Sequence, residues 1–129
     1  MIRERALRVL LVVVGLLFLA TAYPLLRMHL EESLQMMLSI YVTLGVFLLL
    51  ASRNPSANRS LIAFTAWSSF IHASVMTVQS LHDVAERAHL RIGSIAFLVI
   101  GLALLLLAGN LNLKQHVDSI SRRTHGTAY

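Results

Sequence analysis

Four long apolar segments, separated by short polar ones, run along this chain of 129 residues. They cover approximately residues 6–26, 34–51, 61–81 and 92–109. Each segment has about 18 to 21 residues, the length that an α-helix needs to cross a hydrocarbon core of about 30 Å. Because backbone polar groups in lipid must bond within their own segment, the pattern predicts four transmembrane helices.

The connections between these segments are short, at residues 27–33, 52–60 and 82–91. Short connections force neighbouring helices to run antiparallel. The sequence therefore predicts an all-α polytopic membrane protein, a single domain in which four antiparallel helices form an up-down-up-down bundle. Pro24 lies near the end of the first segment, and it is expected to end or kink that helix because proline removes a backbone donor.

Basic residues are distributed unevenly between the two sides of this predicted bundle. The N-terminus, the second connection and the tail hold eight Lys and Arg residues, whereas the first and third connections hold three. By the positive-inside rule, this asymmetry predicts that both termini are cytoplasmic. The net charge of +5 is then explained by orientation, so we expect no nucleic-acid partner.

Two groups of arginines on the predicted cytoplasmic side have a second interpretation. Arg53 and Arg59 in the second connection, and Arg122 and Arg123 in the tail, either orient the helices only or also contact anionic lipid or a partner protein. The tail, residues 110–129, is polar, but it has apolar residues at helical spacing opposite its polar ones, namely Leu113, Val117 and Ile120 opposite Lys114, Gln115, Arg122 and Arg123. This pattern fits either a short helix at the membrane surface or a frayed end.

Composition supports the membrane assignment and removes several kinds of chemistry. Hydrophobic residues make up 57% of the chain and charged residues 13%, compared with about 45 to 50% and about 25% in soluble domains. There is no cysteine, which excludes a disulfide scaffold, a thiol redox centre and an iron–sulfur cluster. We predict no catalytic residues and no resident cofactor.

A polar stripe with one histidine follows the third apolar segment. When this segment is projected at about 100° per residue, the polar and polarisable residues near His72 are Thr65, Ser68, Ser69, Met76, Gln79 and Asp83. Trp67 projects to the other side, where lipid or packing contacts are expected. An ionisable residue in the middle of a membrane span is a candidate functional residue.

The second segment carries a similar stripe, formed by Gln35, Ser39 and Thr43 at intervals of four residues. Because the two helices are antiparallel, the spacing predicts pairs at equal depth: Thr43 with His72, Ser39 with Met76, and Gln35 with Gln79. Two interpretations remain. These residues hold the bundle together through hydrogen bonds between helices, or they line a cavity for a quinone or a lipid.

A metal site is not predicted. His29, His82 and His89 fall in the outer connections together with Asp83 and Glu86, which are suitable ligand types. However, His82 and His89 are seven residues apart, so they do not form the pair that places two ligands on one helical turn. A haem held by two histidines is also excluded, because His72 is the one histidine within the four segments.

Two stretches in the middle of the chain are distinctive: NPSANRSLIAFTAW (residues 54–67) and HASVM (residues 72–76). Through them, residues 34–80 resemble a family of small bacterial integral membrane proteins of unknown function. More loosely, the architecture is similar to DoxX-like four-helix proteins, some of which are associated with membrane redox systems. The resemblance implies a multi-pass protein of the bacterial inner membrane, and it supplies no activity.

Three functions remain open from the sequence. The first is a non-enzymatic membrane protein that acts as an accessory subunit of a complex or as a homo-oligomer. The second is a binder or carrier of a small lipophilic molecule, such as a quinone or lipid, in a polar cavity around His72. The third is a small transporter.

Overall fold

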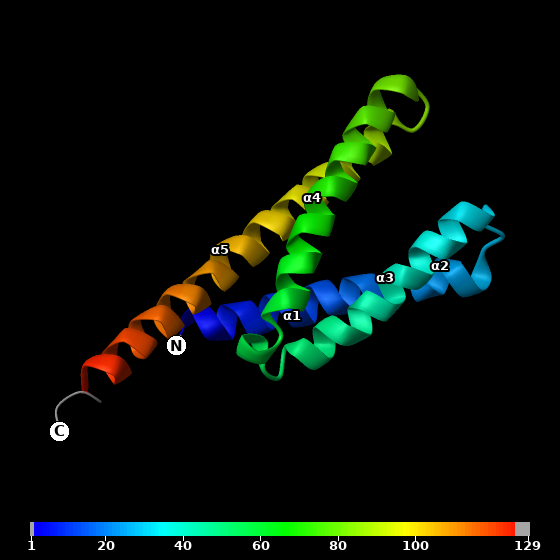
Figure 1. The fold of residues 1–129 in the computed structure, drawn as a ribbon. Helices are drawn as coiled ribbons and strands as arrows, with labels where there is room; N and C mark the ends of the chain where they lie inside the picture. The colour runs from blue at the N-terminus through cyan, green and yellow to red at the C-terminus, as the bar shows by residue number, and fades with distance from the viewer. Residues whose placement is uncertain (1, 126–129) are drawn as a thin grey trace. The chain divides into compact units, whose positions relative to one another are not determined.

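The structure is a computed structural model that describes residues 2–125, of which residues 110–115 and 125 are described as helix without their side chains. Every regular element in this range is helical (Figure 1): α1 (Ile2–Ala20), α2 (Ala22–Arg27), α3 (Glu32–Ala51), the 3₁₀ helix η1 (Pro55–Ala57), α4 (Arg59–His82) and α5 (Arg87–His125). The all-α prediction is confirmed. Four helical segments are long and apolar enough to cross a membrane, at the positions that the sequence predicted, with α1 and α2 together forming the first.

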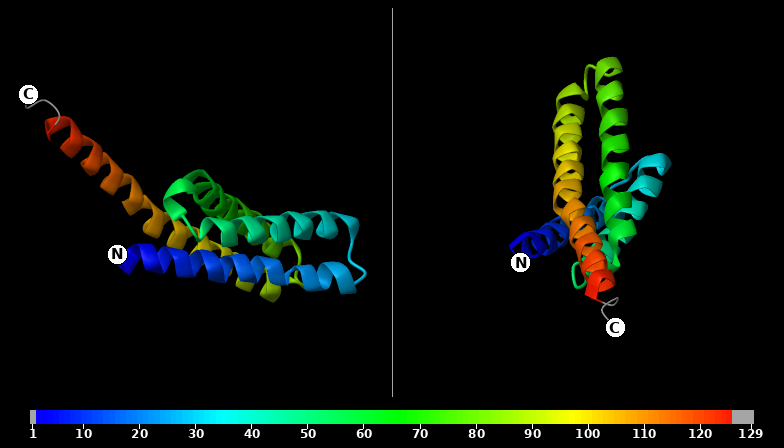
Figure 2. Two further views of the ribbon diagram at one scale, coloured as in Figure 1. Left: turned by 90° about the horizontal axis from the view of Figure 1, so that it is seen from below. Right: turned by 60° about the vertical axis from the view of Figure 1, so that its left-hand side comes forward.

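The chain divides into two compact units, one up to Ile62 and one from Ala63. In the first unit, α1 and α2 return through a short connection as α3, and α1 and α3 lie side by side (Figures 1 and 2). In the second unit, α4 and α5 form a hairpin closed by a tight turn. The arrangement of the four helices as one bundle and the cytoplasmic position of the termini stay predictions.

Two glycines bring α1 and α3 together. A Cβ added to Gly45 would lie 2.7 Å from the carbonyl oxygen of Gly15, and one added to Gly15 would lie 3.0 Å from the carbonyl oxygen of Gly45. One turn away, the rings of Phe18 and Tyr41 meet edge to face with 4.9 Å between their centroids. Small residues at such crossings let backbones approach closely, which is how helices gain packing energy in lipid.

The first span is interrupted at Thr21, between α1 and α2. Pro24 has no N–H to donate to Ala20, and its ring would collide with that carbonyl, so a regular helix cannot pass this point. Thr21 compensates by donating to the carbonyl of Phe18, through its backbone N–H at 3.1 Å and its hydroxyl at 2.6 Å. The sequence predicted that Pro24 ends or kinks this helix, and the structure shows an interruption at Thr21, one turn before the proline, after which the span continues as α2.

The turn between α4 and α5 is fixed by side chains at both helix ends. Asp83 accepts the backbone N–H groups of Ala85 and Glu86 at 3.0 and 3.2 Å, which are donors with no partner inside α5. The guanidinium of Arg87 donates to the carbonyl of Ser80 at 3.0 Å, at the other open helix end. Side chains thereby satisfy backbone groups at both ends of the hairpin turn.

Helix α5 continues far beyond the length that a membrane requires. Its 39 residues correspond to about 58 Å, whereas the apolar part that can span a membrane ends at Gly109. The tail is therefore helical up to His125 and continuous with the fourth span. The side chains of Leu113, Lys114 and Gln115 lie outside the described part of the chain, while Val117, Ile120, Arg122 and Arg123 are exposed.

Candidate functional site

Two hydroxyl groups of the second unit meet where α4 faces α5. Ser94 of α5 is buried, and its hydroxyl lies 2.7 Å from the hydroxyl of Thr77 and 3.0 Å from the carbonyl oxygen of Ala73. Thr77 also lies 2.8 Å from this same carbonyl. The two hydroxyls have two protons between them, so two of these three contacts are donated at one time: one hydroxyl donates to the carbonyl oxygen of Ala73, and the other donates to its neighbouring hydroxyl. We call this arrangement the Ser94 junction.

Small residues on both sides of the Ser94 junction allow α4 and α5 to approach. A Cβ added to Gly101 would lie 3.0 Å from the carbonyl oxygen of Ala66 and 3.2 Å from the ring of Phe70. On the other side, the terminal methyl group of Met76 occupies the space above Gly93. Met76, a candidate ligand residue from the sequence, therefore packs against α5.

His72 contacts α5 through its ring. The centroids of His72 and Phe97 are 4.4 Å apart, and the rings meet at 60°. Edge-to-face contacts of this kind contribute about 0.5 to 1.5 kcal/mol. Within the second unit, one side of His72 is thus occupied by an aromatic ring of the same hairpin.

The three candidates on α3 are exposed and bond to backbone of their own unit. Ser39 donates to the carbonyl of Met36 at 2.7 Å, and Thr43 donates to the carbonyl of Ser39 at 3.0 Å. The amide of Gln35 donates to the carbonyl of Leu30 at 2.8 Å. They belong to the first unit, whereas His72, Met76 and Gln79 belong to the second, so the predicted pairs between the two stripes stay predictions.

Among the candidate arginines, Arg53 is exposed beside η1, and Arg59 is partly buried at the first residue of α4. Asn58 precedes α4. Its backbone carbonyl accepts the N–H of Ile62 at 3.1 Å, and its side-chain amide donates to the carbonyl of Asn54 at 2.9 Å.

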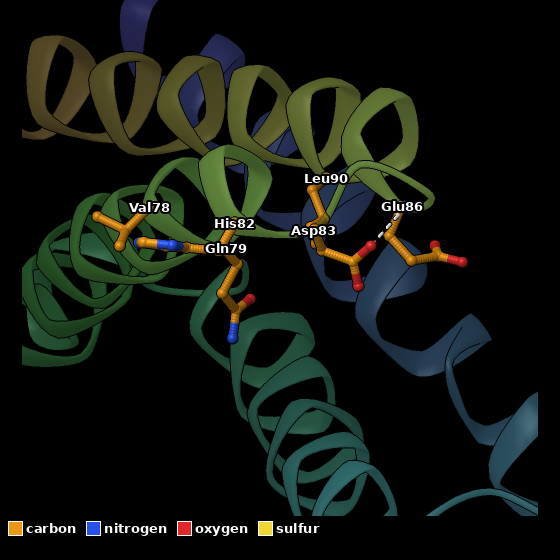
Figure 3. Close-up of a pocket in the computed structure, with 6 residues that line it drawn as sticks. All are labelled: Val78, Gln79, His82, Asp83, Glu86 and Leu90. Carbon is orange, nitrogen blue, oxygen red and sulfur yellow. Dashed lines mark hydrogen bonds between the residues drawn. The ribbon is translucent and has the colours of Figure 1, made fainter.

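An open pocket lies at the turn of the α4–α5 hairpin (Figure 3), with a volume of about 540 Å³. Its lining consists of Val78, Gln79, His82, Asp83, Glu86 and Leu90. Figure 3 shows that the carboxylate of Glu86 points away from the other lining side chains. One oxygen of Asp83 is already used in fixing the turn. Of the six sequence candidates for ligand binding, Gln79 lines this pocket.

The titratable residues of this pocket lie at its surface. His82 and the two carboxylates are exposed, and within residues 2–125 no group of three His, Asp or Glu side chains is arranged to hold a metal ion. The lining combines polar side chains with the apolar Val78 and Leu90, so its chemistry suits a small amphiphilic molecule.

Comparison with protein families gives one result. Residues 3–125 match a family described as a family of unknown function, DUF6632. The chain belongs to this family. The match covers both hairpins, so the α1–α3 crossing and the Ser94 junction both lie within the DUF6632 region. Neither the curated proteins nor the solved structures include a match to this chain.

The sequence reasoning missed the residues that join the two helices of the hairpin in this DUF6632 protein. Thr77, Ala73 and Ala66 were not part of the predicted stripe, and Ser94 was not among the predicted binding residues. A signal was present, because small residues repeat every seven positions along α4, at Ala66, Ala73 and Ser80. All three are buried.

Proposed function

We propose that this chain is a non-enzymatic integral membrane protein that works by assembly, either with copies of itself or as an accessory subunit of a membrane complex. The Ser94 junction carries the proposal. It uses the buried hydroxyl of Ser94 and the hydroxyl of Thr77 to hold α4 and α5 together, so the buried polar group that α5 contributes is already bonded within the hairpin. Packing of His72 on Phe97 and of Met76 on Gly93 supports the same interpretation.

Native mass spectrometry of the protein, gently extracted from its own membrane, tests this proposal. The expected species contain two or more chains, as a multiple of 14.3 kDa or in fixed stoichiometry with other subunits. A single chain that carries one small lipophilic molecule in fixed stoichiometry would overturn the proposal.

Substitution of His72 by alanine is expected to lower the thermal stability of the protein in detergent. The variant loses the ring contact with Phe97, at a cost of about 1 kcal/mol. His82→Ala is the matched control, because His82 lies exposed at the end of the same helix, and surface changes stay within about 0.5 kcal/mol. Thermal unfolding monitored by circular dichroism measures both variants.

The outcome that contradicts a structural role for His72 is specific. In that outcome His72→Ala would unfold at the same temperature as the unchanged protein and would lose a molecule that co-purifies with it. Such a result would favour the second candidate function, the binding of a quinone or lipid around His72.

The pocket at the α4–α5 turn gives that second candidate one supporting observation. Gln79 lies both in the sequence-predicted stripe and in the pocket lining. The seven residues from His72 to Gln79 correspond to about 10 Å along α4, so the pocket supports binding at the end of the hairpin rather than at mid-helix.

A further inference from the structure

The pocket at the α4–α5 turn lies at a boundary between apolar and polar surroundings (Figure 3). The part of α4 that can span a membrane ends at His82, and the corresponding part of α5 begins at Arg87. Val78 and Leu90 belong to these two segments, whereas Asp83 lies in the turn between them. One wall of the pocket is therefore apolar and within reach of lipid, and the other is polar and within reach of water.

Asp83 contributes a carboxylate that the turn already holds in place. Its Oδ1 accepts the backbone N–H groups of Ala85 and Glu86, which fixes the orientation of the side chain. Among the residues that the structure describes, Oδ2 accepts no hydrogen bond. A charged acceptor in a fixed position binds a donor without the cost of ordering its own side chain.

Gln79 supplies a second acceptor beside this carboxylate. The backbone N–H of Asp83 donates to the carbonyl of Gln79 at 2.9 Å, so the two residues are one helical turn apart and project from the same face of α4. Figure 3 shows both side chains extending to the same side of the turn, whereas the carboxylate of Glu86 points away. A primary ammonium group has three N–H donors. Oδ2 of Asp83 and the amide oxygen of Gln79 can accept two of them, which leaves the third for water.

The lining favours a cation, and it favours a primary ammonium over a quaternary one. Asp83 and Glu86 are charged, and none of the six lining residues is Lys or Arg. Arg87, the next residue along the chain, donates to the carbonyl of Ser80. Quaternary ammonium groups are recognised by cages of aromatic rings, but no Phe, Tyr or Trp lines this pocket. A quaternary group also has no N–H to donate to a carboxylate.

We propose that this pocket binds an amphiphile with a primary ammonium head group, which bonds to Asp83 and Gln79 while its chain lies along Val78 and Leu90. Ethanolamine lipids and free long-chain amines share this chemistry. The five residues from Val78 to Asp83 correspond to about 7.5 Å along the helix. A volume of about 540 Å³ therefore holds the head group and the first carbons of the chain, and the rest extends into lipid. This site goes beyond assembly, the proposed function, and does not depend on it.

Lipid retention measured by native mass spectrometry tests the site. Full-length protein is equilibrated in mixed micelles with equal amounts of phosphatidylethanolamine and phosphatidylcholine that carry the same acyl chains. We expect one retained phosphatidylethanolamine per chain, at roughly tenfold the occupancy of phosphatidylcholine, because a hydrogen bond to a charged group contributes at least that factor to affinity.

Asp83→Asn is the decisive variant. It removes the charge and keeps a side-chain oxygen that can accept the N–H groups of Ala85 and Glu86, so the turn is expected to remain. The preference for phosphatidylethanolamine is expected to fall to about twofold or less. Asp118→Asn is the matched control, since it makes the same change at an exposed position on the far part of α5 and is expected to keep the full preference.

Gln79→Leu keeps the proposal testable if Asp83→Asn does not fold. The side chain of Gln79 makes none of the hydrogen bonds that fix the turn, so its removal leaves them in place. The variant loses one neutral acceptor, and the lipid preference is expected to fall to roughly threefold. A tenfold preference that survives in Gln79→Leu and in a folded Asp83→Asn overturns the site.

A second arm of the experiment separates the two sources of the ammonium group. Dodecylamine is added to the protein in phosphatidylcholine nanodiscs, with dodecyltrimethylammonium as the comparison. A preference for dodecylamine together with a preference for phosphatidylethanolamine supports a lipid ligand, and a preference for dodecylamine alone supports a free amine. Equal binding within both pairs of compounds overturns the site.

The number of chains in each species keeps this result separate from the proposed function. The spectra are recorded on protein extracted gently from its own membrane. An ethanolamine preference on species with two or more chains, or with other subunits, supports both proposals. Such species without the preference overturn the ammonium site and leave assembly intact. A single chain that shows the preference overturns assembly and supports the site.

Discussion

Replacing Gly45 by alanine is expected to open the α1–α3 crossing and destabilise the protein. The added methyl group would lie 2.7 Å from the carbonyl oxygen of Gly15 and 2.9 Å from the backbone nitrogen of Leu19. Both atoms are backbone, so they move only if the helices separate. Overpacking costs about 1 to 3 kcal/mol, and the upper part of that range, expected where backbone atoms must move, exceeds the roughly 1 kcal/mol that alanine gains over glycine in a helix.

Gly15→Ala and Gly109→Ala are the matched controls, since each makes the same chemical change. At Gly15 the new methyl group meets the carbonyl of Gly45 at 3.0 Å and the flexible side chain of Leu49 at 3.1 Å, so a smaller loss is expected. At Gly109 it meets nothing within 4 Å, and a small gain in stability is expected. Unfolding temperatures in one detergent should rank Gly109→Ala above Gly15→Ala and Gly15→Ala above Gly45→Ala. Equal unfolding temperatures for Gly45→Ala and Gly109→Ala would contradict the close approach of α1 and α3.

Removal of the Ser94 hydroxyl is expected to have the second large effect. Ser94→Ala deletes the contacts with Thr77 and with the carbonyl of Ala73. Hydrogen bonds between helices in membranes are each worth about 0.6 to 2 kcal/mol, so a loss of about 1 to 2 kcal/mol is expected. Thr77→Val keeps the shape of the side chain and removes the other hydroxyl.

A double-mutant cycle isolates the link between Ser94 and Thr77. We expect the double variant to lose less free energy of unfolding than the two single variants lose together, because each single change already breaks the shared hydrogen bond. Ser74→Ala is the control, since the exposed hydroxyl of Ser74 bonds to Phe70 of its own helix at 2.9 Å. Additive losses of stability in the cycle would contradict the Ser94 junction. A loss of stability in Ser74→Ala as large as that in Ser94→Ala would also contradict it.

Helix number and helix positions followed from the sequence because lipid leaves few alternatives. A segment of apolar residues as long as α3 must satisfy its backbone internally, and only helices achieve this in single segments. The break at Thr21 was also predictable, because the missing N–H of Pro24 acts locally. Both arguments need no knowledge of the partner helix.

The contacts of α4 were harder to predict, for a physical reason. The sequence argument weighted polarity, which directed attention to His72 and Gln79, whereas helix contacts in lipid depend mainly on side-chain size. Polarity does not distinguish Ala66 and Ala73 from the other residues of an apolar segment, but both are buried. The pocket was missed because the tight turn that brings Glu86 and Leu90 beside His82 depends on Asp83 and Arg87.

The division of the chain into two contiguous units has a consequence for its biosynthesis. The contacts between α1 and α3, and those between α4 and α5, join segments that are neighbours in the sequence. Short sequence separation favours fast folding, and chains emerge from the ribosome N-terminal part first. The α1–α3 hairpin can therefore complete its glycine crossing while α4 and α5 are still being synthesised, which limits the time that its facing surfaces are available to other nascent proteins.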